Sequence, residues 1–309
     1  MGALIIAYVC YGMFSDKLNA LDSWIIDHLF VLRTNVKLAD PPYKGTVALV
    51  DANSYFSRPQ HAQVIRNLAA MKVSAQLVDF IFEEMVSKEE DRPLINATKS
   101  AGNVYYGLSF ESLKKQSGKH HKSPETEENI YPGSPKWQVV IKGDSQSFYS
   151  GANPRLTYSA LPSSARGIGF LNLTPDPDGI LRRLPLLVRY RGVLYPSLSF
   201  RTVCDYLGIA PENIIVEPGR SIRLKGVRSG KESEPHDILI PIDKSGHMIL
   251  NDTGFGTDVH HFRYSEIFQA SRNSAKLDQL TNELSGKIVV LSETLQKQYK
   301  TRVALRRKV

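Results

Sequence analysis

Two aspartates lie where carboxylates of α/β proteins commonly reach a ligand. Asp51 directly follows the apolar, β-branched run 46–50, and Asp79 lies within a second apolar run, 76–82. Because parallel strands end at one edge of an open sheet and ligands bind outside that edge, both carboxylates could serve one site. Such a pair suits a divalent cation or a basic ligand. In the alternative interpretation, Asp51 caps a turn and Asp79 is a half-buried hydrogen-bonding residue.

The segment 176–185 contains two further candidates, Arg182 and Arg183. It begins Asp-Pro-Asp-Gly, like a calcium loop, but a third ligand before the glycine and the later glutamate are missing. Its composition predicts a turn that starts a strand, with Gly179 in an unusual backbone conformation. The two arginines point to opposite faces of that strand, where one of them could pair with a carboxylate or bind an anion. The candidate ligand-binding residues are therefore Asp51, Asp79, Arg182 and Arg183.

Other catalytic or cofactor-binding motifs are absent from the sequence. The run 167–169 lacks the third glycine of a dinucleotide fingerprint, and the Gly-Lys pair at 286–287 precedes a strand instead of opening a helix. Gly-x-Ser-x-Gly, His-Glu-x-x-His and paired Cys-x-x-Cys patterns do not occur. Asp258, His260 and His261 could offer metal ligands. We nevertheless predict no catalytic residue, no metal site and no cofactor.

The hydrophobic periodicity predicts a βαβαβ order in the first half of the chain. The elements are a strand at 46–50, a helix at 61–71, a strand at 76–82, a helix at 93–101 and a strand at 104–108. Right-handed crossovers then place the strands in a parallel sheet.

A hairpin and a group of short elements follow in the second half. The strand that starts near 180 turns back at Arg191-Gly192, and its return arm leads into a helix that Gly208 stops. Later strands are expected at 214–216, 221–227, 238–242, 247–250 and 286–291, with a turn at 243–246 between the third and fourth. A short helix is expected at 264–270, with Ser265 as its N-cap.

The N-terminal region has two features that bear on localisation. The apolar run 3–14 is shorter than the roughly 20 residues that cross a bilayer, and it lacks the basic region and cleavage site of a signal peptide. It is either the outer end of a transmembrane anchor or a buried element. From 16 to 33 an apolar stripe predicts a helix, which either is a membrane-proximal stalk able to pair with a second copy or packs on its own domain.

The formal charge of +8 permits binding to a phosphate-rich partner or to an anionic membrane surface. The basic residues are mostly scattered, and the densest group is near the C-terminus, at 297–308. Because no recognised motif or aromatic interleaving accompanies the charge, we predict no nucleic-acid binding.

Several motifs, in order, resemble the second class of CHASE domain, the extracytoplasmic sensor joined to bacterial adenylate cyclases, histidine kinases and serine/threonine kinases. The matching segments are Leu21-Asp22 with Arg33, 47–54, Arg58 with His61, Ala62 and Leu68, Asp79 with Phe82, 101–104, Asp178-Gly179 with Arg182, Arg183 and Pro185, 195–198, and 286–290. The expected Gly-x-Trp-Pro-Trp segment before Arg58 is absent. After Val290 the chain also lacks the expected Gly, Asp and Pro-Gly-Val-x-x-His-Ala segment.

The resemblance implies an α/β fold with a mostly parallel βαβ sheet, an inserted antiparallel hairpin region and a membrane-proximal N-terminal helix. It implies a partial transmembrane anchor at 1–14, a membrane-proximal helix at 15–41 and a sensor domain at 42–309 with a polar insertion at 114–135. The expected function is sensory, without catalysis in this chain, at an extracytoplasmic (periplasmic) membrane location. The expected partners are an unidentified small ligand or periplasmic protein and a second copy of the chain. The alternative is a soluble metal-dependent phosphoryl-transfer or hydrolytic enzyme that uses Asp51 and Asp79.

Overall fold

The computed structural model describes residues 21, 23–29, 32, 45–114, 130–131, 137–176, 178–228, 234–250 and 259–293. The helical residues between 21 and 32 belong to one unit, and residues 45–249 with 259–293 belong to a second, larger unit. The run 3–14, most of the polar insertion and the basic C-terminal segment lie outside the described residues. No helix in the described ranges combines the length and the apolar character needed to cross a membrane.

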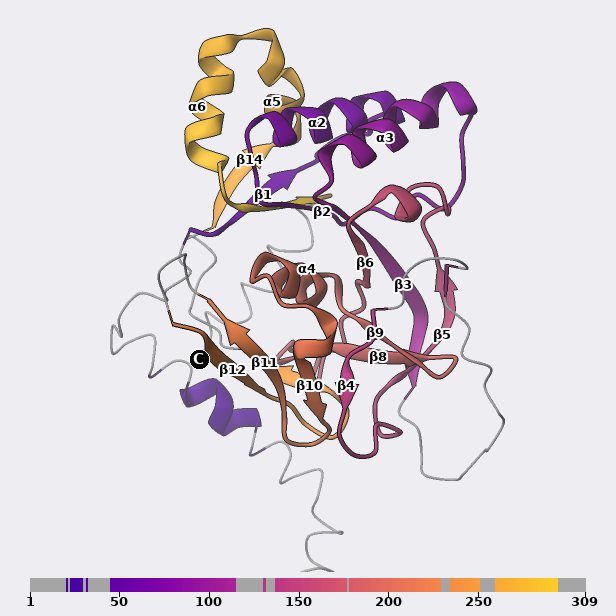
Figure 1. Cartoon of the computed structure of the whole chain (residues 1–309), viewed down its shortest axis with the longest axis vertical. Coiled ribbons are helices and arrows are strands. Elements are labelled where there is room, and N and C mark those ends of the chain that lie inside the picture. Colours follow the sequence, from indigo (N-terminus) through magenta and orange to yellow (C-terminus); the bar gives the residue numbers. More distant parts are fainter. Residues whose placement is uncertain are drawn as a thin grey trace, which may run out of the picture. The chain divides into compact units, whose positions relative to one another are not determined.

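A large sheet organises the larger unit (Figure 1). Its strand order is β14-β1-β15-β2-β3-β5-β8-β9, and β6 pairs with β3. The strands are β1 (Val47–Asp51), β2 (Ala75–Val78), β3 (Val104–Lys114), β5 (Ser150–Arg155), β6 (Gly167–Phe170), β8 (Leu187–Tyr190), β9 (Val193–Pro196), β14 (His260–Arg263) and β15 (Ile288–Ser292). Strands β14, β1, β15, β2, β3 and β6 run parallel to one another, which confirms the predicted βαβ architecture.

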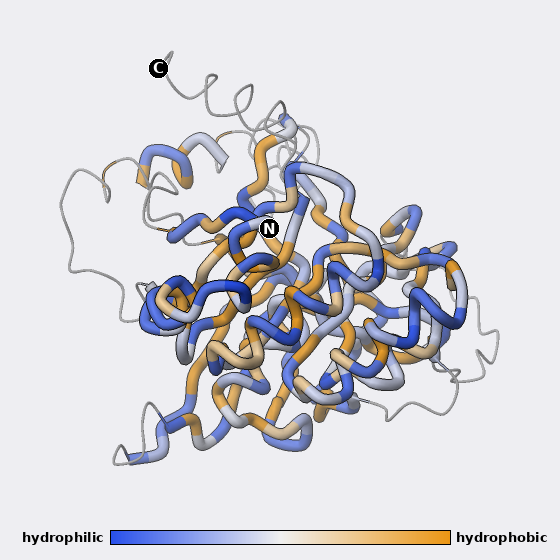
Figure 2. Tube along the Cα trace, turned by 90° about the horizontal axis from the view of Figure 1, so that it is seen from above, coloured by the Kyte–Doolittle hydropathy of each residue, from blue (hydrophilic) through white to orange (hydrophobic). Residues whose placement is uncertain are grey.

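Helices cover both faces of this parallel region. On one face lie α2 (Arg58–Ala70), α3 (Lys88–Ala101), α5 (Tyr264–Gln269) and α6 (Ser274–Leu284), and on the other lies α4 (Leu198–Tyr206) (Figure 1). The first face buries Val64 and Leu68 of α2 against Val50 and Val289 of the sheet. Hydrophobic and hydrophilic stretches alternate along the helices, as expected for elements with one buried side (Figure 2).

Two smaller sheets complete the unit. One has the order β12-β11-β10-β4, and the other pairs β13 with β7. Their strands are β4 (Val140–Ile141), β7 (Arg183–Pro185), β10 (Ile214–Glu217), β11 (Ser221–Val227), β12 (His236–Pro241) and β13 (His247–Ile249). A separate core cluster joins Phe200 and Cys204 of α4 to Ile222 and Leu224 of β11.

The structure corrects two local predictions. Helix α3 begins at Lys88 and not at Pro93, because Ser87 caps it and accepts a hydrogen bond from the backbone N–H of Glu90. The N-cap of α5 is Arg263 and not Ser265. The strands on either side of the turn at 243–246 belong to different sheets, because β12 pairs with β11 and β13 with β7.

Candidate functional site

A pocket lies at the carboxyl edge of the parallel strands. Its cavity volume is about 640 Å³, within the range of small-molecule sites. The loop after β1, the first turn of α2 and the loop after β2 form most of its wall, and Arg155 of β5 and Glu293 complete it. The lining residues from those three segments are Ala52, Ser54, Tyr55, Phe56, Arg58, His61, Asp79, Phe80, Ile81, Phe82, Glu83 and Val86.

Arg58, in the first turn of α2, is held from several sides. Its Nε lies 3.3 Å from Oδ1 of the buried Asp91, and its guanidinium carbon lies 4.1 Å from the centroid of the Phe82 ring. It also donates a hydrogen bond to the carbonyl of Glu84. This cation therefore connects α2 to the loop between β2 and α3 and shapes the pocket wall.

His61, one turn further along α2, is buried among aromatic rings. Phe56, Phe80 and Phe82 surround it, and its Nδ1 forms a short hydrogen bond with the hydroxyl of Tyr264. Burial, followed by the nearby charge of Arg58, lowers the pKa of His61 to about 4. The imidazole is therefore neutral near pH 7.

Asp79 and Glu293 supply the carboxylates of the pocket that have no counter-charge. Within the described part of the chain, neither carboxylate has a hydrogen bond or an ion pair. The side chain of Asp79 is exposed, yet the surrounding protein removes part of its hydration. This desolvation raises the pKa of Asp79 to about 6.

The raised pKa predicts that Asp79 costs stability at neutral pH. A folded-state pKa near 6, above the ordinary 3.8, means that the native state binds the proton more tightly than the unfolded state. The cost is present above pH 6 and vanishes below 3.8. We expect Asp79→Asn to raise the Tm by roughly 2–4 °C at about pH 8, since solvent screens this exposed group, and to leave it unchanged at about pH 3.

Thermal unfolding across this pH range tests the expectation. Asp278→Asn is the matched control, because it removes the same charge from an exposed position on α6. The expectation would be contradicted if Asp79→Asn raised the Tm equally at both pH values, or if the control variant raised it by a similar amount.

The structure places Asp51 and Asp79 at the same edge of the sheet but on different strands. Asp51 pairs in register with Ser292 of β15, and Asp79 follows β2 on the far side of β15. Two strand spacings, about 10 Å, thus separate their backbones. The carboxylate of Asp51 accepts a hydrogen bond from His261 of β14 at 3.0 Å, and Asp51 is not among the residues that line the pocket. Among the residues that the structure describes, no group of His, Cys, Asp or Glu could hold a metal ion.

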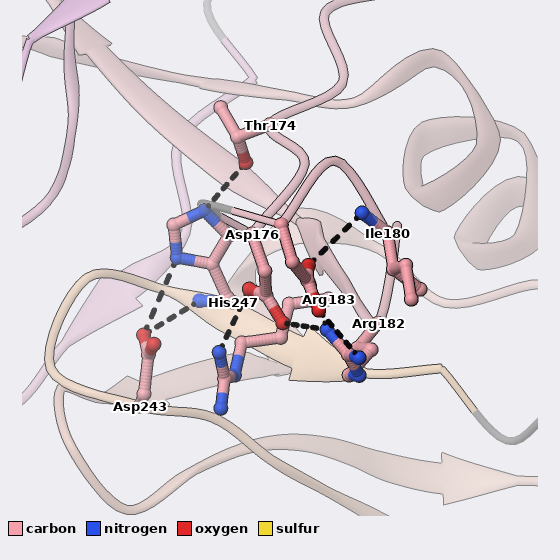
Figure 3. A network of polar contacts seen from close by, with 8 residues as sticks. Thr174, Asp176, Ile180, Arg182, Arg183, Asp243 and His247 are labelled. Carbon is pink, nitrogen blue, oxygen red and sulfur yellow. Dashed lines mark hydrogen bonds and ion pairs between the residues drawn. The ribbon is translucent and has the colours of Figure 1, made fainter. Parts of the chain in front are cut away.

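The structure places Arg182 and Arg183 away from this pocket, in a network of ion pairs (Figure 3). Arg182 is 4% exposed and donates to Asp176 at 3.1 Å and to Asp178 at 3.0 and 2.8 Å. Arg183 donates to the other oxygen of Asp176 at 2.9 Å. Gly179 has a φ of +79°, which confirms the predicted turn. These contacts favour structural pairing over anion binding for both arginines.

A Thr-His-Asp arrangement lies next to that network (Figure 3). Nε2 of His247 is 3.0 Å from the hydroxyl of Thr174, and its Nδ1 is 3.5 Å from Asp243. The same Asp243 oxygen accepts the backbone N–H groups of Ser245 and His247 at 2.8 and 2.9 Å. Since the aspartate organises the turn before β13 and the histidine is buried, this arrangement ties the loop before β7 to β13.

The site residues predicted from the sequence did not include Arg58, His61, Asp91 or Glu293. Arg58 and His61 opened a recognisable helix, but their orientation toward the pocket depends on the loop after β2. Ser87, with Glu90 three residues later, is a capping signal that would have placed Asp91 in the first turns of α3. Glu293 had no local signal, because its position depends on β15 lying beside β2.

The fold and this geometry define a mixed α/β domain with an open pocket at the carboxyl edge of its parallel sheet. The family model of the CHASE2 domain matches residues 3–304, nearly the whole chain. The chain therefore belongs to the CHASE2 domain family, a family of extracytoplasmic sensory domains that are not catalytic. No curated protein and no solved structure matches the chain.

Proposed function

We propose that this chain is the ligand-binding input domain of a membrane-bound bacterial signalling protein, such as an adenylate cyclase or a kinase. The observation that carries the proposal is the pocket between the loops after β1 and β2. The chain belongs to a family of sensory domains, and its pocket has the size of a small-molecule site. Both observations support this function. The metal-dependent enzyme has no supporting observation among the described residues.

A ligand in this pocket would contact two loops that lead directly into α2 and α3. It would therefore favour whichever arrangement of these loops binds it more tightly, and the difference in affinity between arrangements is the signal. Of the four candidate ligand-binding residues, Asp79 is retained in this proposal as a pocket residue, while Asp51, Arg182 and Arg183 support the surrounding structure.

The proposal includes membrane anchoring and pairing of two copies through the N-terminal helix. In the described part of that helix, most apolar side chains are exposed. Four of them recur three or four residues apart, which gives a stripe suited to a second copy of the helix. These four are Leu21, Ile25, Leu29 and Leu32, and the exposed Trp24 lies beside them.

Labelling of a single exposed cysteine in intact cells tests the location. Lys99→Cys places a thiol on the exposed surface of α3, in cells that make the chain with its natural flanking sequence. We expect a membrane-impermeant maleimide to label this variant without lysis, and the unsubstituted chain, whose cysteines are Cys10 and Cys204, to give the background. Labelling that requires lysis would overturn the extracytoplasmic location.

A further inference from the structure

Both arginines that line the pocket already have a carboxylate partner. Arg58 lies 3.3 Å from Asp91, and Arg155 forms an ion pair with Glu83. Because each guanidinium charge is offset locally, neither is left to attract an anionic ligand strongly. Among the described residues at the pocket, the N-terminus of α2 is the remaining positive feature, and such a helix dipole attracts an anion only weakly.

Among the residues that the structure describes, no cation offsets the carboxylates of Asp79 and Glu293 in this way. They lie at neighbouring strand ends, since Val78 of β2 pairs in register with Leu291 of β15 and these carboxylates follow shortly after. His61 adds no positive charge near pH 7, because burial keeps its pKa near 4. The uncompensated charge of the pocket is therefore negative.

The remaining wall is largely aromatic. Phe56, Phe80 and Phe82 line the pocket, and Tyr55 is 89% exposed at its mouth. Ring faces attract cations through their quadrupole. An aromatic ring and a carboxylate already bind one cation together in this protein. The guanidinium of Arg58 lies over the ring of Phe82, and the carboxylate of Asp91 offsets its charge.

We propose that the pocket binds an organic cation, an amine or quaternary ammonium compound that carries an apolar group. Asp79 and Glu293 provide the counter-charge, and the rings contact the apolar group. The inference rests on the proposed function, because it names the chemical class of the ligand for the same pocket. A volume of about 640 Å³ also fits an organic molecule better than a bare ion.

A series of three probes that differ mainly in charge tests the inference. They are 2-phenylethylammonium, 2-phenylethanol and 3-phenylpropanoate, each titrated calorimetrically against the 309-residue chain. We expect the cation to bind roughly tenfold more tightly than the alcohol, and the carboxylate to bind most weakly. Asp79→Asn should reduce the preference for the cation by roughly five- to tenfold, and Asp278→Asn should leave it intact.

A second variant separates the two proposals. Ser54→Trp places a large side chain at an exposed lining position and should reduce the binding of whichever probe occupies the pocket. If the alcohol or the carboxylate binds best and Ser54→Trp blocks it, the cation inference is wrong and the pocket proposal stands. If the cation binds Ser54→Trp and the unsubstituted chain equally, the pocket proposal fails as well. Absence of binding by the cation overturns the inference.

Discussion

Asp91→Ala is expected to lower the free energy of unfolding by about 3–5 kcal/mol, the usual cost of removing one partner of a buried ion pair. Asp91 is 1% exposed. Its carboxylate accepts the backbone N–H groups of Val86 and Ser87 at 2.7 and 3.1 Å and the hydroxyl of Tyr158 at 2.9 Å. Its removal leaves these donors and the Arg58 guanidinium without their acceptor.

The same substitution should also weaken ligand binding, because Arg58 and the loop after β2 form the pocket wall. Urea unfolding measures the first effect, and titration with 2-phenylethylammonium measures the second. Glu89→Ala is the matched control, since it removes an exposed acidic residue from the first turn of the same helix. That change should cost no more than about 1 kcal/mol. Equal losses in both variants would show that Asp91 does not anchor this region.

The sequence patterns predicted the positions of the strands in the chain better than the order of the strands in the sheet. The β-branched run at 46–50 predicted β1 within one residue, and the run at 286–291 predicted β15. Neither run reveals that β15 lies between β1 and β2, because strand order depends on contacts between residues far apart in the chain. This position brings Glu293 to the pocket and separates Asp51 from Asp79.

The predictions of helix boundaries were wrong where a local sequence rule allowed two interpretations. Proline is favoured in the first turn of a helix, which predicts a helix start at Pro93, but this residue lies inside α3. The prediction omits helix α6, although Leu277, Leu280 and Leu284 recur at helical spacing. The caps Ser87 and Asn273 mark the starts of these two helices.

The sequence predicted the ion pairs of Arg182 and Arg183 with carboxylates only in part. The sequence indicates only that one of the two could pair with a nearby carboxylate or bind an anion, and it does not identify the carboxylate. The structure shows that Asp176 binds both arginines, one through each oxygen. Such sharing requires the turn to fold back on the strand, which Gly179 permits through its positive φ.

Arg182→Ala is expected to destabilise the chain by about 3 kcal/mol or more near pH 7, because it removes the buried cation that pairs with both Asp176 and Asp178. Arg183→Ala, which removes a side chain that is 33% exposed, should cost about 1 kcal/mol or less. The hydrogen bond from Arg182 lowers the pKa of Asp178 below the ordinary 3.8.

The contribution of this pair is therefore present above pH 3.8 and is lost as the pH falls through the lowered pKa. The difference in stability between the two variants should then narrow as the pH falls below that lowered pKa. Urea unfolding at pH 7 and at low pH measures it. One result would instead indicate an anion site. In that case the two variants would be equally stable at pH 7, and Arg182→Ala would bind phosphate more weakly than the unsubstituted chain. Because 4% exposure leaves Arg182 little contact with solvent, we expect the stability difference.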